Sequence, residues 1–132
     1  MKETLTTGLT TTTRYAIDQG RTISFMGEEG RVYATPELVR DIENTCRDLL
    51  LEHLDPGEDS VGTRVELDHI AATPFGMWVE ITATLTMLDG RRAGFEITAH
   101  DPVEKVAFGK HYRFIVDVEK SIARLKKKVE KE

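Results

Sequence analysis

Apolar residues recur at steps of three and four over residues 35–54, TPELVRDIENTCRDLLLEHL, and this spacing predicts one long amphipathic helix. Thr35 is the expected N-cap, with Pro36 at the first helical position and Glu37 in the first turn, where a carboxylate suits the positive end of the helix dipole. The helix should end before Asp55-Pro56-Gly57, because a residue that precedes proline avoids helical angles. The predicted buried face consists of Leu38, Val39, Ile42, Cys46, Leu49, Leu50 and His53.

Glu43 lies at the margin of this apolar face, beside Val39 and Leu50, and away from the solvent side that carries Arg40 and Asn44. A carboxylate at such a position needs a specific partner or a route to water, which a long side chain can provide. Glu43 is therefore a candidate functional residue, and an edge glutamate that reaches solvent is the alternative.

The pattern elsewhere has period two, which predicts five β-strands at residues 9–17, 61–72, 77–88, 91–99 and about 104–118. Asp89-Gly90 is a strong hairpin signal between the third and fourth of these strands. Residues 19–34 contain three glycines and predict a loop that is long enough to act as a flap. A short amphipathic C-terminal helix is predicted by the helical spacing of Val118, Ile122, Leu125 and Val129.

Two of the predicted strands each have a face that is relevant to function. In the second strand, alternation predicts one shared face for Val61, Thr63, Val65, Leu67, His69 and Ala71. In the last strand it predicts another for Val106, Phe108, Tyr112, Phe114 and Val116. His100 and His111, which flank a hairpin, are expected at the surface or at an interface.

These elements predict an α+β protein with the hot-dog fold, in which an antiparallel five-stranded sheet wraps around one long central helix and a short helix follows. A helix of that length spans about 30 Å, and five strands make a sheet about 24 Å wide, so one helix can cover one whole face. The other face and one edge strand stay open, which predicts pairing with a second copy, as a homodimer or a tetramer.

The chain has 132 residues, which suits a single domain over residues 1–132. A net charge of −5 argues against a general nucleic-acid binder, which needs a basic face. No apolar run is long enough for a membrane span, and the N-terminus lacks the apolar segment of a secretory signal. The single cysteine, Cys46, fits a reducing compartment, so a cytoplasmic protein is expected.

Candidate chemistry is sparse when each residue is taken alone. His69 lies on an apolar strand face, where a histidine is more often a structural residue than a catalyst, and Thr35 is explained as an N-cap. Cys46 lies on the buried helix face and is interpreted as a small core residue. The remaining histidines, His53, His100 and His111, have no ligand-like spacing with carboxylates or cysteine, so no metal site and no cofactor are expected.

Taken together, the residues resemble a known family. Thr35 with Glu43, the segment SVGTRVELDHIAATPFG (residues 60–76) and the segment AHDPVEKVAFGKHYR (residues 99–113) are similar to the fluoroacetyl-CoA thioesterase family of hot-dog thioesterases. The resemblance covers residues from about 35 to 118. It implies that Thr35, Glu43 and His69 form the catalytic trio, and that Gly62 presents its main chain to the acyl thioester.

The implied activity is hydrolysis of a small acyl-CoA thioester at sites on the interface of a homodimer. His69 would move protons, Glu43 would act as a base or as the partner of a nucleophile, and a backbone N–H would hold the oxyanion. The first bond could be made by Thr35, by Glu43 or by water. Lys105, Lys110 and Arg113 are candidates to meet the phosphates of coenzyme A, with ordinary surface charges as the alternative.

Two features depart from the family pattern. Pro36 and a charged first turn follow Thr35, and the preceding loop has only Phe25 and Tyr33 as nearby aromatic residues, with no clear match to the aromatic gate associated with fluoroacetyl selectivity. The alternative function is a hot-dog dimer that binds an acyl-CoA or a related ligand without cleaving it. A hot-dog hydratase or dehydratase is a weaker alternative, because the different Asp/His arrangement on which those enzymes generally rely is not found here.

Overall fold

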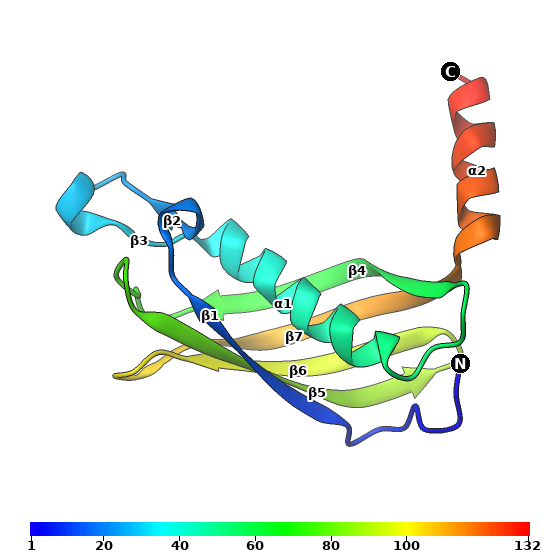
Figure 1. Ribbon diagram of the computed structural model, residues 1–132, viewed down its shortest axis with the longest axis horizontal. Coiled ribbons are helices and arrows are strands. Elements are labelled where there is room, and N and C mark those ends of the chain that lie inside the picture. Colours follow the sequence, from blue (N-terminus) through cyan, green and yellow to red (C-terminus); the bar gives the residue numbers. More distant parts are fainter.

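A five-stranded antiparallel sheet curls around one long helix in the computed structural model, which describes residues 1–132 (Figure 1). The sheet has the strand order β1-β5-β6-β7-β4. Its strands are β1 (Thr10–Ala16), β4 (Glu58–His69), β5 (Trp78–Asp89), β6 (Arg92–His100) and β7 (Lys105–Asp117). The helix α1 (Thr35–Leu51) lies across its concave face. The predicted hot-dog architecture is confirmed.

Helix α1 differs from the prediction at both ends. It ends at Leu51, three residues earlier than predicted, and the chain then turns through His53 and Leu54. The N-cap is Ala34, which provides no side-chain hydrogen bond, so the predicted capping role of Thr35 is wrong. Thr35 is instead the first helical residue, and its hydroxyl is free for another partner.

Residues 19–34 form a flap with more structure than a loop. Two short 3-10 helices, η1 (Gln19–Arg21) and η2 (Glu28–Gly30), alternate with β2 (Thr22–Ile23) and β3 (Val32–Tyr33), which pair with each other. The flap is tied to the β4–β5 turn, because the N–H of Tyr33 donates to the carbonyl of Thr73 at 2.9 Å. It therefore ends in a fixed position directly before α1.

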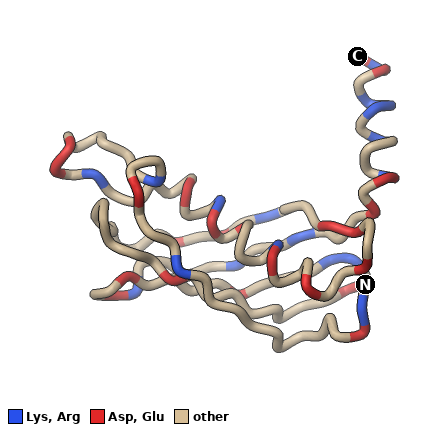
Figure 2. The backbone as a smooth tube through the Cα atoms, in the orientation of Figure 1, with Lys and Arg blue, Asp and Glu red and all other residues tan.

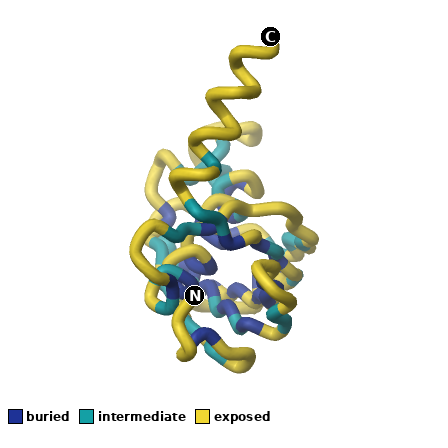
Figure 3. The backbone as a smooth tube through the Cα atoms, turned by 90° about the vertical axis from the view of Figure 1, so that its right-hand side faces the viewer, coloured by how far each residue is buried: buried dark blue, intermediate teal, exposed yellow.

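The core lies between α1 and the sheet, where the inward residues of β5 and β6 meet the apolar face of the helix. Its helical part contains the predicted Leu38, Ile42, Cys46, Leu49 and Leu50, all of them buried. Val39 and His53 are only half-buried. Figure 3 shows the buried segments in the body of the protein and the exposed course of α2 (Val118–Glu130). This C-terminal helix, predicted from its spacing, stands away from the sheet (Figure 1).

A β-bulge in β4 overturns the predicted face of that strand. The register with β7 shifts between Gly62 and Arg64, so the alternation changes phase at Thr63. The residues that face inward are Gly62 before the bulge and Val65, Leu67 and His69 after it. A period-two pattern cannot reveal an extra residue, and for that reason the sequence wrongly grouped Val61 and Thr63 with His69.

In β7 the residues predicted to share one face do so only in part, and that face is the outer one. Phe108 and Phe114 are 40% and 43% exposed. The inward positions are taken by Ala107, His111, Arg113 and Ile115, all buried. Of the two expected positions for His111, the surface is therefore wrong, because the residue is buried within its own chain, whereas His100 is exposed.

Basic and acidic residues are interspersed along the chain, as Figure 2 shows. No helix combines the length and the apolar character required to cross a bilayer.

Candidate active site

The first turn of α1 and the last residue of β4 bring Thr35 and His69 together. The hydroxyl Oγ1 of Thr35 lies 2.8 Å from Nδ1 of His69, although the two residues are 34 positions apart in the chain. Thr35 is exposed and His69 is half-buried. A hydroxyl in hydrogen-bond contact with an imidazole is the basic unit of nucleophile activation and of general base catalysis.

The other imidazole nitrogen of His69 has no partner. Nε2 is buried and forms no hydrogen bond. The ring of Tyr33 meets the imidazole edge-on, with ring centroids 6.3 Å apart and an angle of 79° between the planes. One hydrogen bond and one aromatic contact therefore set the orientation of His69.

Burial keeps this histidine in its neutral form. Desolvation lowers the pKa of His69 below its ordinary value of about 6.5. At neutral pH the imidazole can therefore accept a proton from the Thr35 hydroxyl or from a water molecule, provided that Nδ1 is the unprotonated nitrogen.

A small, mainly apolar hollow opens beside this pair. Its volume is about 260 Å³. It is lined by Ile23, Val32, Tyr33, Thr35, His69, Ile70, Ala71 and Ala72. The start of α1 forms part of its wall, and Pro36 has no N–H, so the backbone donors nearest to Thr35 in the first turn are the amides of Thr35 and Glu37.

Glu43 lies elsewhere in the same chain. It follows Thr35 by two helical turns, which corresponds to about 12 Å along the axis. Its carboxylate faces Gly62, because a Cβ atom at that glycine would lie 2.9 Å from Oε1 of Glu43 and 3.2 Å from Cε1 of His111. Within one chain the structure brings Thr35 and His69 together, and places Glu43 beside Gly62.

The position of Arg113 corrects the expected basic surface patch. Arg113 is 4% exposed and donates from Nε to Oγ of Ser60 at 2.7 Å and from Nη2 to the Ser60 carbonyl at 2.8 Å. Its Nη1 lies 3.1 Å from Nε2 of His111, whose Nδ1 lies 2.8 Å from the carbonyl of Arg64. The guanidinium is thus part of the interior beneath Glu43, where a phosphate at the surface cannot reach it.

These contacts determine which ring nitrogen of His111 carries the proton. Its Nε2 accepts from Arg113, so Nδ1 carries the proton and donates to the Arg64 carbonyl. Burial lowers the pKa of His111, and the neighbouring guanidinium acts in the same direction, while the hydrogen bond to Arg64 opposes them. Neutral His111 and cationic Arg113 together form a polar floor under Glu43 and Gly62.

The two lysines predicted to meet phosphates are both exposed, in different surroundings. Lys105 starts β7 at the end of the sheet that carries His69, with its ammonium 4.9 Å from the ring centroid of Phe108. Lys110 is paired in register with Glu66 and Glu96 on the outer face. Two acidic residues are therefore its cross-strand neighbours.

A buried carboxylate in α1 was not anticipated from the sequence. Asp41 is 1% exposed, and its two oxygens accept from Nε and Nη2 of Arg21 at 2.8 and 3.2 Å. The hydroxyl of Tyr33 donates to the same carboxylate at 2.5 Å. Asp41 follows Leu38 by three residues and precedes Thr45 by four, so helical spacing alone could have placed it among buried neighbours.

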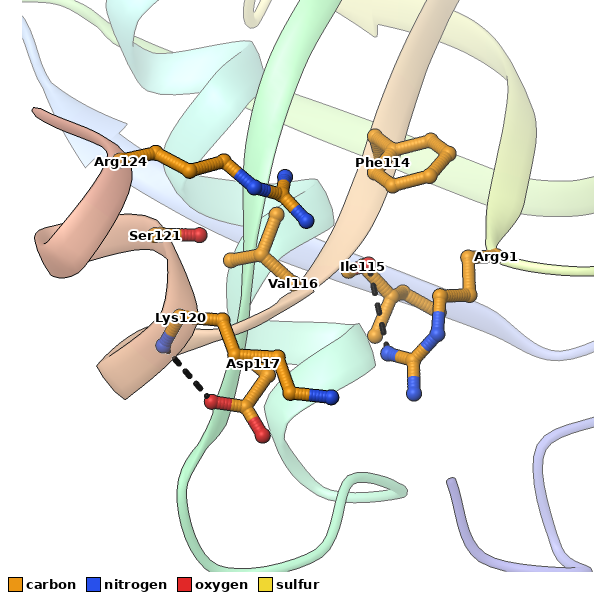
Figure 4. A pocket seen from close by; sticks show the side chains of 8 residues that line it. All are labelled: Arg91, Phe114, Ile115, Val116, Asp117, Lys120, Ser121 and Arg124. Atoms are coloured by element: carbon orange, nitrogen blue, oxygen red, sulfur yellow. Dashed lines mark hydrogen bonds between the residues drawn. The ribbon is translucent and has the colours of Figure 1, made fainter. Parts of the chain in front are cut away.

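Cys46 and the remaining hollows contribute no further chemistry to this site. Burial raises the pKa of the Cys46 thiol to about 12, so the residue is a neutral core side chain, as predicted. No group of three or more His, Cys, Asp or Glu residues is arranged to hold a metal ion. A hollow at the base of α2, shown in Figure 4, is lined by Arg91, Phe114, Ile115, Val116, Asp117, Lys120, Ser121 and Arg124.

Comparison with known proteins decides the family. The profile of the fluoroacetyl-CoA-specific thioesterase family matches residues 17–119. The fluoroacetyl-CoA thioesterase of Streptantibioticus cattleyicolor is 38% identical over 97 residues, which cover 74% of this chain and 70% of that protein. The chain belongs to the fluoroacetyl-CoA thioesterase family. As a member it is an acyl-CoA thioesterase, and the non-catalytic binding module is not favoured.

Solved structures agree with this assignment. A structure of the fluoroacetyl-CoA thioesterase FlK has a TM-score of 0.87 at 31% identity, and the match covers 96% of this chain and 98% of that chain. A thioesterase superfamily member from Thermus thermophilus has a TM-score of 0.86 at 26% identity, with 98% and 99% coverage. The resemblance to the family that residues 35–118 suggested is confirmed.

Proposed function

We propose that this thioesterase hydrolyses a short acyl-CoA thioester, of the size of fluoroacetyl-CoA, to the acid and free coenzyme A, and that it does so as a homodimer. The observation that supports this most strongly is the contact of 2.8 Å between Thr35 and His69 at the wall of a small apolar hollow. At about 260 Å³ this hollow suits a short acyl group better than a long chain.

Catalysis needs a proton acceptor, a nucleophile and a site for the developing oxyanion. Neutral His69 takes the proton from the Thr35 hydroxyl or from a water molecule that the hydroxyl holds, and later returns it to the coenzyme A thiolate. The free amides at the start of α1 stabilise negative charge on the thioester oxygen. Glu43 is the third member, as a base or as the first nucleophile. If Thr35 or Glu43 makes the first bond, a water molecule then hydrolyses the acyl-enzyme and releases the acid.

Glu43 requires a second subunit to join the other two residues. Edge strand β4 pairs only with β7, so its other side is free to accept the β4 strand of a second copy. A two-fold axis perpendicular to the sheet keeps both α1 helices on the same face and places opposite ends of the two β4 strands side by side. The His69 end of one subunit then meets the Gly62 and Glu43 region of the partner subunit.

The charges on β4 favour one register. With the axis near Val65, Arg64 lies opposite Glu66 of the partner subunit on the outer face, and Val65 lies opposite its own copy on the inner face. Opposite charges directly across two antiparallel strands stabilise the pair, whereas like charges destabilise it. This register brings Glu43 of the partner subunit towards the exposed hydroxyl of Thr35.

A subunit-mixing experiment tests the shared site. Thr35→Ala and Glu43→Gln homodimers should both be inactive. If each site takes Thr35 and His69 from one chain and Glu43 from the other, a mixed dimer of the two variants contains one intact site and regains up to half of the wild-type activity. If all three residues act from the same chain, both sites of the mixed dimer are damaged and activity is not regained.

Hydrolysis itself is tested with acetyl-, fluoroacetyl-, butyryl- and octanoyl-CoA and a thiol reporter. We expect turnover of the two-carbon substrates and much less of the octanoyl thioester. A folded dimer that releases no thiol from any of the four would overturn the proposed reaction. Ligand-induced thermal stabilisation in the absence of thiol release would then favour a binding protein.

Two further assignments follow from the same proposal. Lys105, at the His69 end of the sheet, contacts a phosphate of coenzyme A, whereas Lys110 is the weaker candidate because its cross-strand neighbours Glu66 and Glu96 would repel a phosphate. The enzyme works in the cytoplasm, which is consistent with an unpaired, buried cysteine.

A further inference from the structure

The imidazole of His69 is held by only one hydrogen bond. In many hydrolases a carboxylate binds the second nitrogen and fixes the ring. Here Nε2 is buried without any hydrogen-bond partner, and the hydrogen bond between Nδ1 and the Thr35 hydroxyl does not by itself prevent the ring from rotating about that contact. Another group has to fix the ring if the proton is to pass reliably between these two residues.

The ring of Tyr33 is that group. It meets His69 edge-on at a centroid distance of 6.3 Å and is itself 1% exposed. Edge-to-face aromatic pairs at this distance are attractive and directional. Because the Tyr33 ring packs directly against the imidazole of His69, a displacement of the tyrosine ring changes the orientation of the histidine.

Tyr33 is fixed at its far end by an ionic network around the buried carboxylate of Asp41. Its hydroxyl donates to Asp41, and Arg21 donates to both oxygens of the same carboxylate. Arg21 also lies 3.0 Å from Asp18, which it binds through Nη1. A carboxylate that accepts three hydrogen bonds, two of them from a guanidinium, is a rigid anchor.

The backbone adds a second connection between the same elements. The N–H of Ala34 donates to the carbonyl of Arg21 at 2.9 Å, and that of Tyr33 donates to Thr73. Arg21 therefore holds the residue directly before Thr35 through its main chain, and holds Tyr33 through Asp41. The anchor of the flap and the start of the catalytic helix are one connected unit.

We infer that Tyr33 is a positioning residue, which the Asp41–Arg21 pair holds against His69 so that Nδ1 of the imidazole stays aligned with the hydroxyl of Thr35. This inference depends on the proposed function for its kinetic consequence. Its structural part, the dependence of His69 on the hydroxyl of Tyr33, can be tested without any turnover.

Tyr33→Phe is the direct test, since it keeps the ring and removes only the hydroxyl. Without that bond to Asp41 the ring is free to shift, so the Thr35–His69 alignment is lost for part of the time. We expect kcat to fall about tenfold, which corresponds to about 1.4 kcal/mol in the barrier, with KM changed less than twofold. The substrate still enters the same hollow, because its apolar lining is unchanged.

Tyr15→Phe is a matched control. The hydroxyl of Tyr15 belongs to the same polar region, where it lies 3.1 Å from the Asp41 carbonyl and 2.9 Å from Oγ1 of Thr45. No contact joins Tyr15 to His69. Its loss should lower stability by an amount similar to that of Tyr33→Phe, as thermal unfolding will show, and leave kcat unchanged.

The structural arm compares the imidazole signals of His69 in the two variants by NMR. Wild type and Tyr15→Phe should give the same His69 signals, and Tyr33→Phe should shift or broaden them. Arg21→Gln, which leaves Tyr33 intact, should cause a change in the same direction by releasing Asp41. If Tyr33→Phe leaves both kcat and the His69 signals as in wild type, the inference is overturned.

The kinetic and NMR experiments also distinguish a failure of this inference from a failure of the proposed function. An equal fall in kcat in Tyr15→Phe and Tyr33→Phe would show a general structural effect and contradict the positioning role. If wild type hydrolyses none of the acyl-CoA substrates, the proposed function fails, and the NMR comparison still decides whether Tyr33 orients His69.

Discussion

A Cβ atom at Gly62 would lie 2.9 Å from the carboxylate oxygen Oε1 of Glu43, closer than such atoms approach in folded proteins. The second nearest group, His111, is buried and cannot move aside. Gly62→Ala should therefore displace the Glu43 carboxylate and lower kcat by at least tenfold, with only a small loss of stability, because the end of a flexible side chain can move aside. Gly20→Ala is the control, because the nearest atom to its Cβ would be 3.7 Å away. Wild-type kinetics in Gly62→Ala would contradict a role for Glu43 at this position.

A lysine in place of Val65 should separate the dimer. Val65 is 37% exposed in the single chain and lies next to the proposed two-fold axis, where two lysines would repel each other in an apolar contact. We expect Val65→Lys to elute as a folded monomer and to lose hydrolysis, because Glu43 no longer meets Thr35. Thr12→Lys, on edge strand β1, should stay dimeric and active. A dimeric, active Val65→Lys protein would contradict pairing through β4.

Stability should decrease as the pH falls from 7 to about 5.5. Burial lowers the pKa of both His69 and His111, so the unfolded chain, with pKa values near 6.5, binds more protons than the native protein in this range. The contribution of the two neutral histidines to the free energy of unfolding is fully present above about pH 6.5. It is lost as the pH falls towards their lower pKa values in the native protein. Each histidine can add a slope of at most about 1.4 kcal/mol per pH unit.

His111→Gln isolates one part of this dependence. The amide can accept from Arg113 and donate to the Arg64 carbonyl without titrating, so urea unfolding at several pH values should show a shallower slope than in wild type. Exposed His100→Gln serves as the control. A wild-type slope in His111→Gln would show that this histidine is not kept neutral by the fold.

Lys105→Gln should raise KM for acyl-CoA two- to fivefold with little effect on kcat, because a phosphate contact contributes to binding and not to the barrier. The effect should decline at high salt, which screens an exposed charge. Lys126→Gln, on the projecting helix α2, is the control and should leave KM unchanged. An equal effect of both substitutions would indicate general electrostatic attraction.

The helical period of residues 35–54 and the alternation of the strands predicted the fold, because one long amphipathic helix and five strands leave few ways to bury their apolar faces. The pair Thr35 and Glu43, together with the segments of residues 60–76 and 99–113, also carried the resemblance that named Thr35, Glu43 and His69 as candidates. The predicted helix and strands occur in the folded protein because the period of the apolar side chains determines which face of each element can be buried.

Other features depended on the tertiary structure. The bulge at Thr63 reverses which side chains of β4 face inward, and alternation cannot detect one inserted residue. Arg113 and His111 resemble surface residues in the sequence, but β7 runs through the interior of the sheet and turns them towards α1.

Local spacing and motifs were enough to predict the elements, their order and the residue types available for thioester chemistry. Three contacts became visible only in the folded chain: the hydrogen bond between Thr35 and His69, the position of Glu43 beside Gly62, and the link that Asp41 makes between Arg21 and Tyr33. Contacts between residues far apart in the chain depend on the register and curvature of the sheet, which no local pattern specifies.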